Sequence, residues 1–245
     1  LLECIEGFGI DETLNKVIGM FAFAYYDIKS NKLYLCRDRA GEKPLYYWMD
    51  NKQEAIYFSS ELRSLLAGFP GDPEINETAL DEYFSLSYIS APNTIVKGVS
   101  KLPPATLAVI DLNNTKLNIK HTQYWQLPTN KIQIDVEEAK EELAHLVSDS
   151  VKMQMSADVP VGAFLSGGVD SSLVVSIAQS LSSRPIHTYT VGFNDNDFNE
   201  ATDAKDFARY LNTEHNELYL SSKDILDCIP EIVKSFDEPV GDVSL

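Results

Sequence analysis

Apolar and polar positions follow two different periods along this chain, and the period changes after about residue 125. Near the start, Leu2, Ile5 and Phe8 are spaced as on one face of a short helix. The apolar stretches that follow are short and rich in aromatic and β-branched residues, which is typical of strands. The predicted elements are two strands within 20–38 around a turn at Ser30 and Asn31, strands at 53–60 and 106–112, and a helix at 76–84 capped by Asn76. Strand pairs with few helices favour an α+β or β-rich domain.

A polar segment at 125–135, which contains Pro128, reads as a linker, and helical spacing follows it. One predicted helix has apolar positions at Val136, Ala139, Leu143, Leu146 and Val147, and the next has them at Leu173, Val174, Ile177, Ala178 and Leu181. Short buried strands are predicted at 159–165, 186–192 and 215–220, and a third helix at 200–211. Strands that alternate with helices in this way predict a parallel, doubly wound α/β sheet.

The composition is that of an ordinary globular protein, with 245 residues, of which 44% are hydrophobic and 23% charged. A formal net charge of −17 without a Lys or Arg cluster argues against nucleic acid as a partner. No apolar run approaches the roughly 18 residues of a membrane span, so no membrane partner is expected. Three scattered cysteines suit neither a disulfide framework nor a zinc site, and they favour a reducing compartment, the cytoplasm.

The densest candidate chemistry is the segment "FLSGGVDSSL" at 164–173, between a predicted strand and a predicted helix. Gly167 and Gly168 allow a tight turn and a close approach of the backbone to a ligand. Ser166, Ser171 and Ser172 supply hydroxyl groups, and the helix start supplies free N–H donors at its positive end. These groups together suit a phosphate.

Asp170 is the one carboxylate in this segment, and it would repel a bare phosphate. Its expected task is therefore to hold Mg²⁺ that is bound to the phosphates. The segment has no lysine of the Walker A kind. Serine and aspartate are also ordinary helix caps, and Gly-Gly is an ordinary turn. The complete string in a strand–loop–helix context favours the nucleotide over this structural alternative.

The string "SGGVDSS" at 166–172 resembles the signature of the PP-loop ATP pyrophosphatases. Members of that superfamily bind ATP at this loop and release pyrophosphate while they adenylate a carbonyl oxygen. The rest of the chain resembles glutamine-hydrolysing asparagine synthetases, through the stretches at 19–48, 58–66, 88–106, 187–193, 198–220 and 237–245. The resemblance covers essentially the whole chain, in the family's order.

Two truncated domains are implied by this resemblance. Residues 1–127 would be the later part of an α+β class II glutamine amidotransferase (glutaminase) domain. Residues 128–245 would be the first part of an α/β parallel-sheet PP-loop domain, the ATP pyrophosphatase domain. Both ends of the chain are expected to be cuts within a longer protein.

The implied reaction uses glutamine, aspartate and ATP. Ammonia released from glutamine reaches a second site, where ATP has converted aspartate to β-aspartyl-AMP, and it displaces AMP to give asparagine. A homodimer is an open expectation of the same resemblance. The carried-over ATP-binding residues are Leu165 and Ser166 for adenosine, Gly167, Gly168, Asp170, Ser171 and Ser172 for pyrophosphate with Asp170 on Mg²⁺, and Val191 for the adenine pocket. A plain core role is as well supported for Val191.

No catalytic residue of either reaction is expected within these 245 residues. The family's N-terminal nucleophilic cysteine and its Ser-Gly-Glu loop have no counterpart here, so the chain alone should neither hydrolyse glutamine nor complete amide synthesis. Cys4 is expected to pack on the apolar side of a helix, and Cys36 inside a strand.

Several polar residues have two interpretations on sequence alone. The charged run Arg37–Lys43 could order a domain interface or an ammonia path, and a solvated ion-pair loop is slightly favoured. Asp237 and Glu238 could belong to an acceptor pocket or to a turn before Pro239. The four histidines are dispersed without metal-ligand spacing, and structural roles are expected for them.

Three alternatives to an asparagine synthetase remain open. A related amidotransferase could amidate another carboxylate, such as a sugar acid in surface polysaccharide synthesis. A non-catalytic scaffold could retain the fold, although the intact Asp170 argues against it. A tRNA-modifying PP-loop enzyme would not explain the first half and would be expected to have a basic surface.

Overall fold

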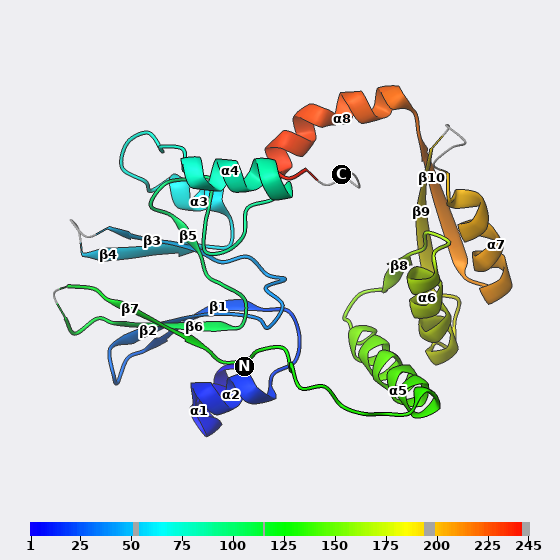
Figure 1. Ribbon diagram of the computed structural model, residues 1–245, viewed down its shortest axis with the longest axis horizontal. Coiled ribbons are helices and arrows are strands. Elements are labelled where there is room, and N and C mark those ends of the chain that lie inside the picture. Colours follow the sequence, from blue (N-terminus) through cyan, green and yellow to red (C-terminus); the bar gives the residue numbers. More distant parts are fainter. Residues whose placement is uncertain (51–53, 115, 194–198, 242–245) are drawn as a thin grey trace. The chain divides into compact units, whose positions relative to one another are not determined.

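The computed structural model describes residues 1–50, 54–114, 116–193 and 199–241 (Figure 1). The chain forms two compact units. Unit 1 consists of Leu1–Thr129 together with Glu231–Leu245, and unit 2 of Asn130–Pro230. The division of the family's domains after residue 127 stays a prediction.

Unit 1 contains a four-stranded antiparallel sheet in the order β1-β2-β6-β7 (Figure 1). Its strands are β1 (Ala22–Asp27), β2 (Lys32–Arg37), β6 (Thr106–Asp111) and β7 (Ile119–Gln123). The predicted hairpin at 20–38 is confirmed, with Asn31 in the left-handed region at φ 50° and Asp27 accepting from the Lys29 N–H at 2.9 Å. Leu35 and Ile110 are fully buried on one side of the sheet.

A second sheet of unit 1 has the order β4-β3-β5, with β3 (Tyr46–Asp50), β4 (Ala55–Ser59) and β5 (Ser100–Lys101). The predicted strand at 53–60 corresponds to β4, whereas β3, β5 and β7 were not anticipated. Trp48 of β3 stacks on Tyr57 of β4, with ring centroids 4.7 Å apart. Since aromatic pairs on one face add to the burial of apolar area, this contact fixes the pairing of the two strands.

Short helices accompany the sheets of unit 1: α1 (Leu2–Phe8), α2 (Ile10–Lys16), α3 (Leu62–Leu66) and α4 (Glu77–Leu86). Asn76 caps α4 as predicted, because its side-chain oxygen accepts from the Ala79 N–H at 3.4 Å. Helix α1 exists, but Ile5 is its one buried residue. Cys4 is exposed, so its predicted packing role is wrong: the helical period was identified, but not which face is covered.

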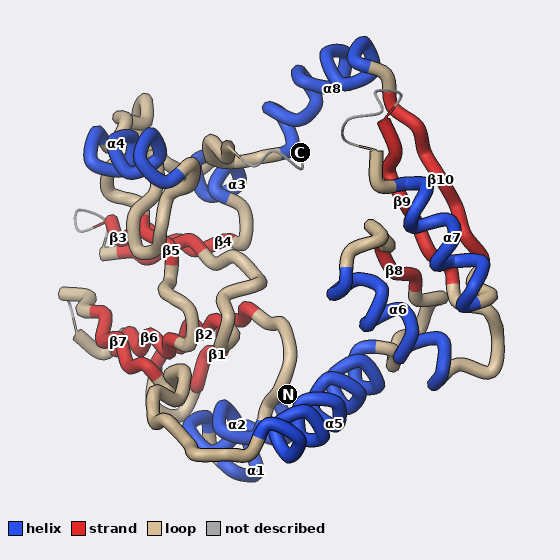
Figure 2. The backbone as a smooth tube through the Cα atoms, turned by 45° about the vertical axis from the view of Figure 1, so that its right-hand side comes forward, coloured by secondary structure: helices blue, strands red, loops and turns tan. Residues whose placement is uncertain are grey.

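Unit 2 contains the predicted parallel sheet, in the order β10-β9-β8 (Figure 2). Its elements in chain order are α5 (Val136–Gln154), β8 (Gly162–Phe164), α6 (Val169–Leu181), β9 (His187–Phe193), α7 (Ala201–Leu211) and β10 (Glu214–Leu220). Helix α7 buries a face made of Ala201, Ala204 and Ala208. These small side chains bring α7 close to β9, where an added Cβ on Gly192 would lie 3.0 Å from the Ala201 Cβ.

The buried face of α6 agrees with the predicted one at Ala178, with Ile177 packed against the same core, and differs from it at other positions. Ser172, Val175 and Ala178 are buried, while Leu173 and Leu181 are 48% and 44% exposed. The sequence is apolar around most of this helix, so its period did not select a single face.

Helix α8 (Ser222–Ser235) was not predicted, and Pro230 lies inside it. Its first part belongs to unit 2, and the chain beyond Pro230 belongs to unit 1. Among the described residues, no helix has both the length and the apolar character that crossing a membrane would require.

Candidate functional site

The segment at 165–172 joins β8 to α6 at the carboxyl end of a parallel strand, which is where ligands bind in open α/β sheets. The Leu165 N–H donates to the Tyr189 carbonyl at 2.9 Å, which extends the pairing of β8 with β9 by one residue. Helix α6 then begins at Val169, with Gly168 at its N-cap. The sheet therefore fixes one end of the loop and the helix fixes the other.

Gly167 gives this loop its shape. Its φ is +79°, in the region that favours glycine. A Cβ at this position would lie 3.0 Å from the Asp203 Cβ and 3.2 Å from the Ala204 nitrogen. The loop therefore lies directly against the first turn of α7, which leaves no room for a side chain at residue 167.

Two serines hold the loop together from within. The Ser166 and Ser171 Oγ atoms are 2.9 Å apart, and the Ser166 N–H donates to the Ser171 Oγ at 3.2 Å. The Ser171 hydroxyl also lies 3.2 Å from the Gly168 carbonyl, and the Gly168 N–H lies 3.4 Å from the Ser166 Oγ. Ser166 is exposed and Ser171 is half-buried, and both side chains stabilise the turn.

Ser172 is different, because its Oγ is buried and has no hydrogen-bond partner within the described residues. A buried hydroxyl without a partner costs about 1–3 kcal/mol, and a ligand oxygen or a bound water would remove that cost. The unpaired hydroxyl, the glycine turn and the helix start together match the donor set that a phosphate requires.

Asp170 lies in the first turn of α6 and is exposed to solvent. Within the described part of the chain, no group of three His, Cys, Asp or Glu side chains could hold a metal ion. A single carboxylate is compatible with a magnesium ion whose other ligands are phosphate oxygens and water.

Leu165 and Val191, the other two residues that the family resemblance implies for ATP binding, lie in different environments. The Leu165 side chain is fully buried in the core of unit 2, beside Val175 and Ala204, so it is not exposed to a ligand. Val191 lies on β9 and is 44% exposed, so it is not a core residue in this structure and could contact a ligand.

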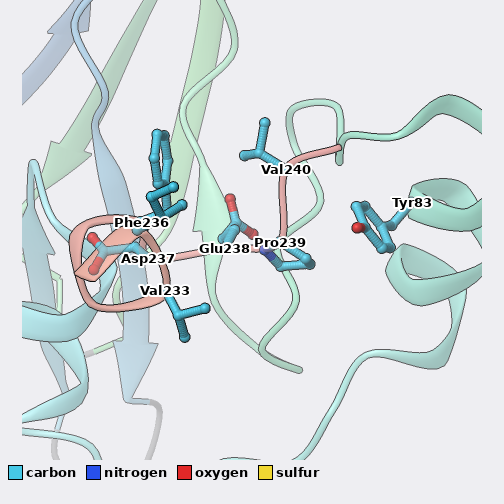
Figure 3. Close-up of a pocket in the computed structure, with 8 residues that line it drawn as sticks. Tyr83, Val233, Phe236, Asp237, Glu238, Pro239 and Val240 are labelled. Carbon is cyan, nitrogen blue, oxygen red and sulfur yellow. The ribbon is translucent and has the colours of Figure 1, made fainter. Parts of the chain in front are cut away.

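Asp237 and Glu238 are committed to contacts within unit 1. Figure 3 shows them in the turn that follows α8. One Asp237 carboxylate oxygen accepts the Leu62 N–H at 2.6 Å. Glu238 accepts the Ile95 N–H at 2.8 Å and pairs with Lys101 at 2.7 Å, with both side chains of the pair almost buried. Both carboxylates therefore anchor this turn, as the turn interpretation predicted, and both also line the cavity beside it.

A cavity of about 460 Å³ in unit 1 lies beside this turn (Figure 3). Tyr83 of α4 and the end of α8 line it, with Val233, Phe236 and Val240 as apolar neighbours.

Burial and then the neighbouring Glu238 carboxylate raise the pKa of the Tyr46 hydroxyl above its ordinary range, so that Tyr46 is a neutral donor to Glu238.

The charged run Arg37–Lys43 is held by main-chain contacts, while Glu42 and Lys43 are themselves exposed. Arg37 donates to the carbonyls of Lys43 at 2.8 Å and Leu102 at 2.7 Å. Asp38 is 1% exposed and accepts the Glu42 and Lys43 N–H groups at 3.0 and 2.9 Å. Burial opposes its ionisation, but these backbone donors lower the pKa of Asp38 overall. Arg37 and Asp38 thus order this turn through main-chain groups, whereas the buried Arg39 Nε has no hydrogen-bond partner within the described residues.

Cys36 is fully buried in β2, as predicted, and burial raises the pKa of its thiol to about 12. Because the thiolate is the reactive form, we expect Cys36 to resist alkylation at about pH 8. Iodoacetamide followed by mass spectrometry should modify the exposed Cys4 and Cys228 in the folded chain, and Cys36 only after denaturation. Equal rates at all three cysteines would contradict the buried position.

Three histidines have structural partners: His121 lies 3.2 Å from the Tyr47 hydroxyl, His215 lies 3.0 Å from the Thr188 hydroxyl, and His187 lies 3.6 Å from a Glu214 oxygen. Burial lowers the pKa of His121 and of His215.

Sequence reasoning did not single out Thr190, whose buried hydroxyl donates to the Leu165 carbonyl at 2.5 Å. Along β9, buried residues such as Thr190 alternate with more exposed ones, and this period of two was the signal that could have indicated its burial.

Comparisons with known proteins match the chain to two family models. Residues 1–125 match the family model described as glutamine amidotransferase domain, and residues 142–245 match the one described as asparagine synthase. A protein of Methanocaldococcus jannaschii, named as a glutamine-hydrolysing asparagine synthetase, is 37% identical over 100% of this chain and 47% of its own length. Asparagine synthetase 1 of Bacillus subtilis is 35% identical over 95% of this chain and 36% of its own.

The chain thus spans about half the length of these curated relatives, or less. Among solved structures, an NMN synthetase from Francisella tularensis is 24% identical, covers 42% of each chain and has a TM-score of 0.30.

Proposed function

The chain belongs to the glutamine amidotransferase domain family over residues 1–125 and to the asparagine synthase family over residues 142–245, and on this premise we propose that unit 2 binds ATP at the loop 165–172. The whole protein would then be an ATP-dependent amide synthetase that converts aspartate to asparagine with ammonia from glutamine. One observation carries the ATP assignment: a glycine-turned loop with an unpaired buried hydroxyl leads into the start of α6.

A carboxylate needs activation before ammonia can attack it, because its oxygen is a poor leaving group. Adenylation supplies AMP as the leaving group, and pyrophosphate is released in that step. The residues of this chain would act on the phosphates. Ser166, Ser171 and Ser172 would donate to phosphate oxygens, and the first N–H groups of α6 would bind the negative charge. Val191 would contribute apolar surface to the base.

Asp170 would hold a magnesium ion against the phosphate oxygens. The ion would neutralise charge that develops on the leaving pyrophosphate. The exposed position of the carboxylate in the first turn of α6 supports this role. A carboxylate in the first turn also stabilises the helix itself, so its two contributions must be separated by experiment.

The test is a calorimetric titration of the chain with Mg-ATP, beside the variant Asp170→Asn. We expect the variant to bind Mg-ATP about tenfold more weakly, since one charge-assisted contact to the ion is worth about 1.5–3 kcal/mol. The matched control is Asp203→Asn, which removes a first-turn carboxylate from the neighbouring helix α7. Equal affinities for the unaltered chain and Asp170→Asn would contradict the magnesium assignment. No binding by the unaltered chain would contradict the ATP site.

A further inference from the structure

A single peptide unit at the entrance of the loop is held from both sides. The Leu165 carbonyl accepts from the Thr190 hydroxyl at 2.5 Å, and the N–H of the same peptide unit, on Ser166, donates to the Ser171 Oγ at 3.2 Å. A peptide unit is planar, so bonds at its oxygen and at its hydrogen fix its rotation about the chain. The direction of the chain into Gly167 follows from that rotation.

The anchor on β9 is well placed for this task. Thr190 is 5% exposed, and Leu165 is fully buried, so the hydrogen bond lies in the interior of unit 2. A β-branched side chain on a strand has few rotamers, and its hydroxyl therefore occupies a defined position. Gly167 follows two residues after Leu165 and lies against the first turn of α7, where a small displacement of the loop would create a clash.

We propose that Thr190 is a positioning residue for phosphate binding: its buried hydroxyl orients the Leu165–Ser166 peptide, and through it the loop that receives the pyrophosphate part of ATP. This inference rests on the proposed function of the loop. Thr190 itself touches neither phosphate nor base. Its effect should therefore appear in the affinity for the pyrophosphate part of ATP and not in the affinity for the AMP part.

The experiment compares Thr190→Val with the unaltered chain, in calorimetric titrations with Mg-ATP, Mg-pyrophosphate and AMP. Valine has nearly the same shape but leaves the Leu165 carbonyl without its donor. We expect Mg-ATP and Mg-pyrophosphate to bind about tenfold more weakly, which corresponds to about 1.4 kcal/mol. AMP should bind with nearly unchanged affinity. Thr190→Ser, which restores the hydroxyl, should restore the affinity for both phosphate ligands.

Thr188→Val is the matched control. Thr188 lies on the same face of β9, is fully buried, and its hydroxyl lies 2.9 Å from the Thr213 hydroxyl and 3.0 Å from His215 Nδ1 rather than near the loop. Its loss should lower the thermal stability of unit 2 and leave Mg-pyrophosphate affinity unchanged. If Thr190→Val fails to fold by circular dichroism, the smaller Thr190→Ala replaces it.

Three results would overturn the proposal. Thr190→Val could bind Mg-pyrophosphate as the unaltered chain does, or it could lose AMP and pyrophosphate equally, as a merely destabilised unit would. Thr188→Val could also weaken pyrophosphate binding to the same extent, which would make any buried threonine of β9 equivalent. Absence of Mg-ATP binding by the unaltered chain would instead overturn the proposed function, and this inference with it.

Discussion

Lys101→Met is expected to lower the free energy of unfolding of unit 1 by about 3 kcal/mol, the cost of removing one partner from a buried ion pair. The side chains of Lys101 and Glu238 are 13% and 9% exposed, and their charged atoms lie 2.7 Å apart. Without the lysine, the Glu238 carboxylate keeps the Ile95 N–H and the Tyr46 hydroxyl as donors but loses its counter-charge. The Ile89 carbonyl also loses the donor that Lys101 supplies at 2.6 Å.

The measurement is urea unfolding followed by tryptophan fluorescence. Both tryptophans, Trp48 and Trp125, belong to unit 1, so their emission reports on that unit without a contribution from unit 2. The matched control is Lys97→Met, since Lys97 pairs with Glu74 at 2.8 Å while both side chains remain about 70% exposed. Exposed pairs contribute little, so the control should hardly move the midpoint. Equal shifts for the two variants would show that the Lys101 pair is not buried in solution.

Gly167→Ala is expected to weaken Mg-ATP binding by about a hundredfold. A non-glycine residue pays about 1–2 kcal/mol in the left-handed region, and here the added Cβ would also lie 3.0 Å from the Asp203 Cβ. The least costly response is for residue 167 to change from a positive to a negative φ. This change would turn the N–H groups of the loop away from the phosphates. Calorimetry with Mg-ATP measures the loss.

Gly168→Ala provides the comparison. Gly168 has φ −71°, and a Cβ there would meet the Ser166 Oγ at 3.4 Å, an ordinary contact distance. The loss of affinity should therefore be clearly smaller than at Gly167, although alanine is a poorer N-cap than glycine. If both variants bind Mg-ATP equally well, the conformation of Gly167 is not what shapes the site.

The sequence predicted the three strands and the helices α5, α6 and α7 of unit 2, because each apolar run there is short and bounded by glycine or polar residues. Parallel pairing followed from their alternation, and the sheet order β10-β9-β8 agrees with it. In unit 1 the hairpin at 20–38 was predictable from local turn chemistry. Strand β7 was not, since "IKHTQ" pairs along its whole length but keeps its side chains largely exposed.

Which face of a helix is buried could not be derived from the period alone. Helix α6 is apolar on more than one side, and its buried Ser172 replaces the predicted Leu173 and Leu181. Long-range partners were equally inaccessible. No local signal shows that Glu238 will meet Ile95, because the two residues are 143 positions apart. For the same reason the Thr190 contact with Leu165, 25 residues away, is evident only in the structure.

Unit 1 is discontinuous along the chain, and this has a consequence for its synthesis. Domains usually fold in the order in which they leave the ribosome. Here the turn that supplies the Glu238 carboxylate emerges only after all of Asn130–Pro230 has been made. The sheets of the first 129 residues can form early, but Lys101 has no ion-pair partner until Glu238 has been synthesised. The part of the protein that is translated first is therefore the part that is completed last.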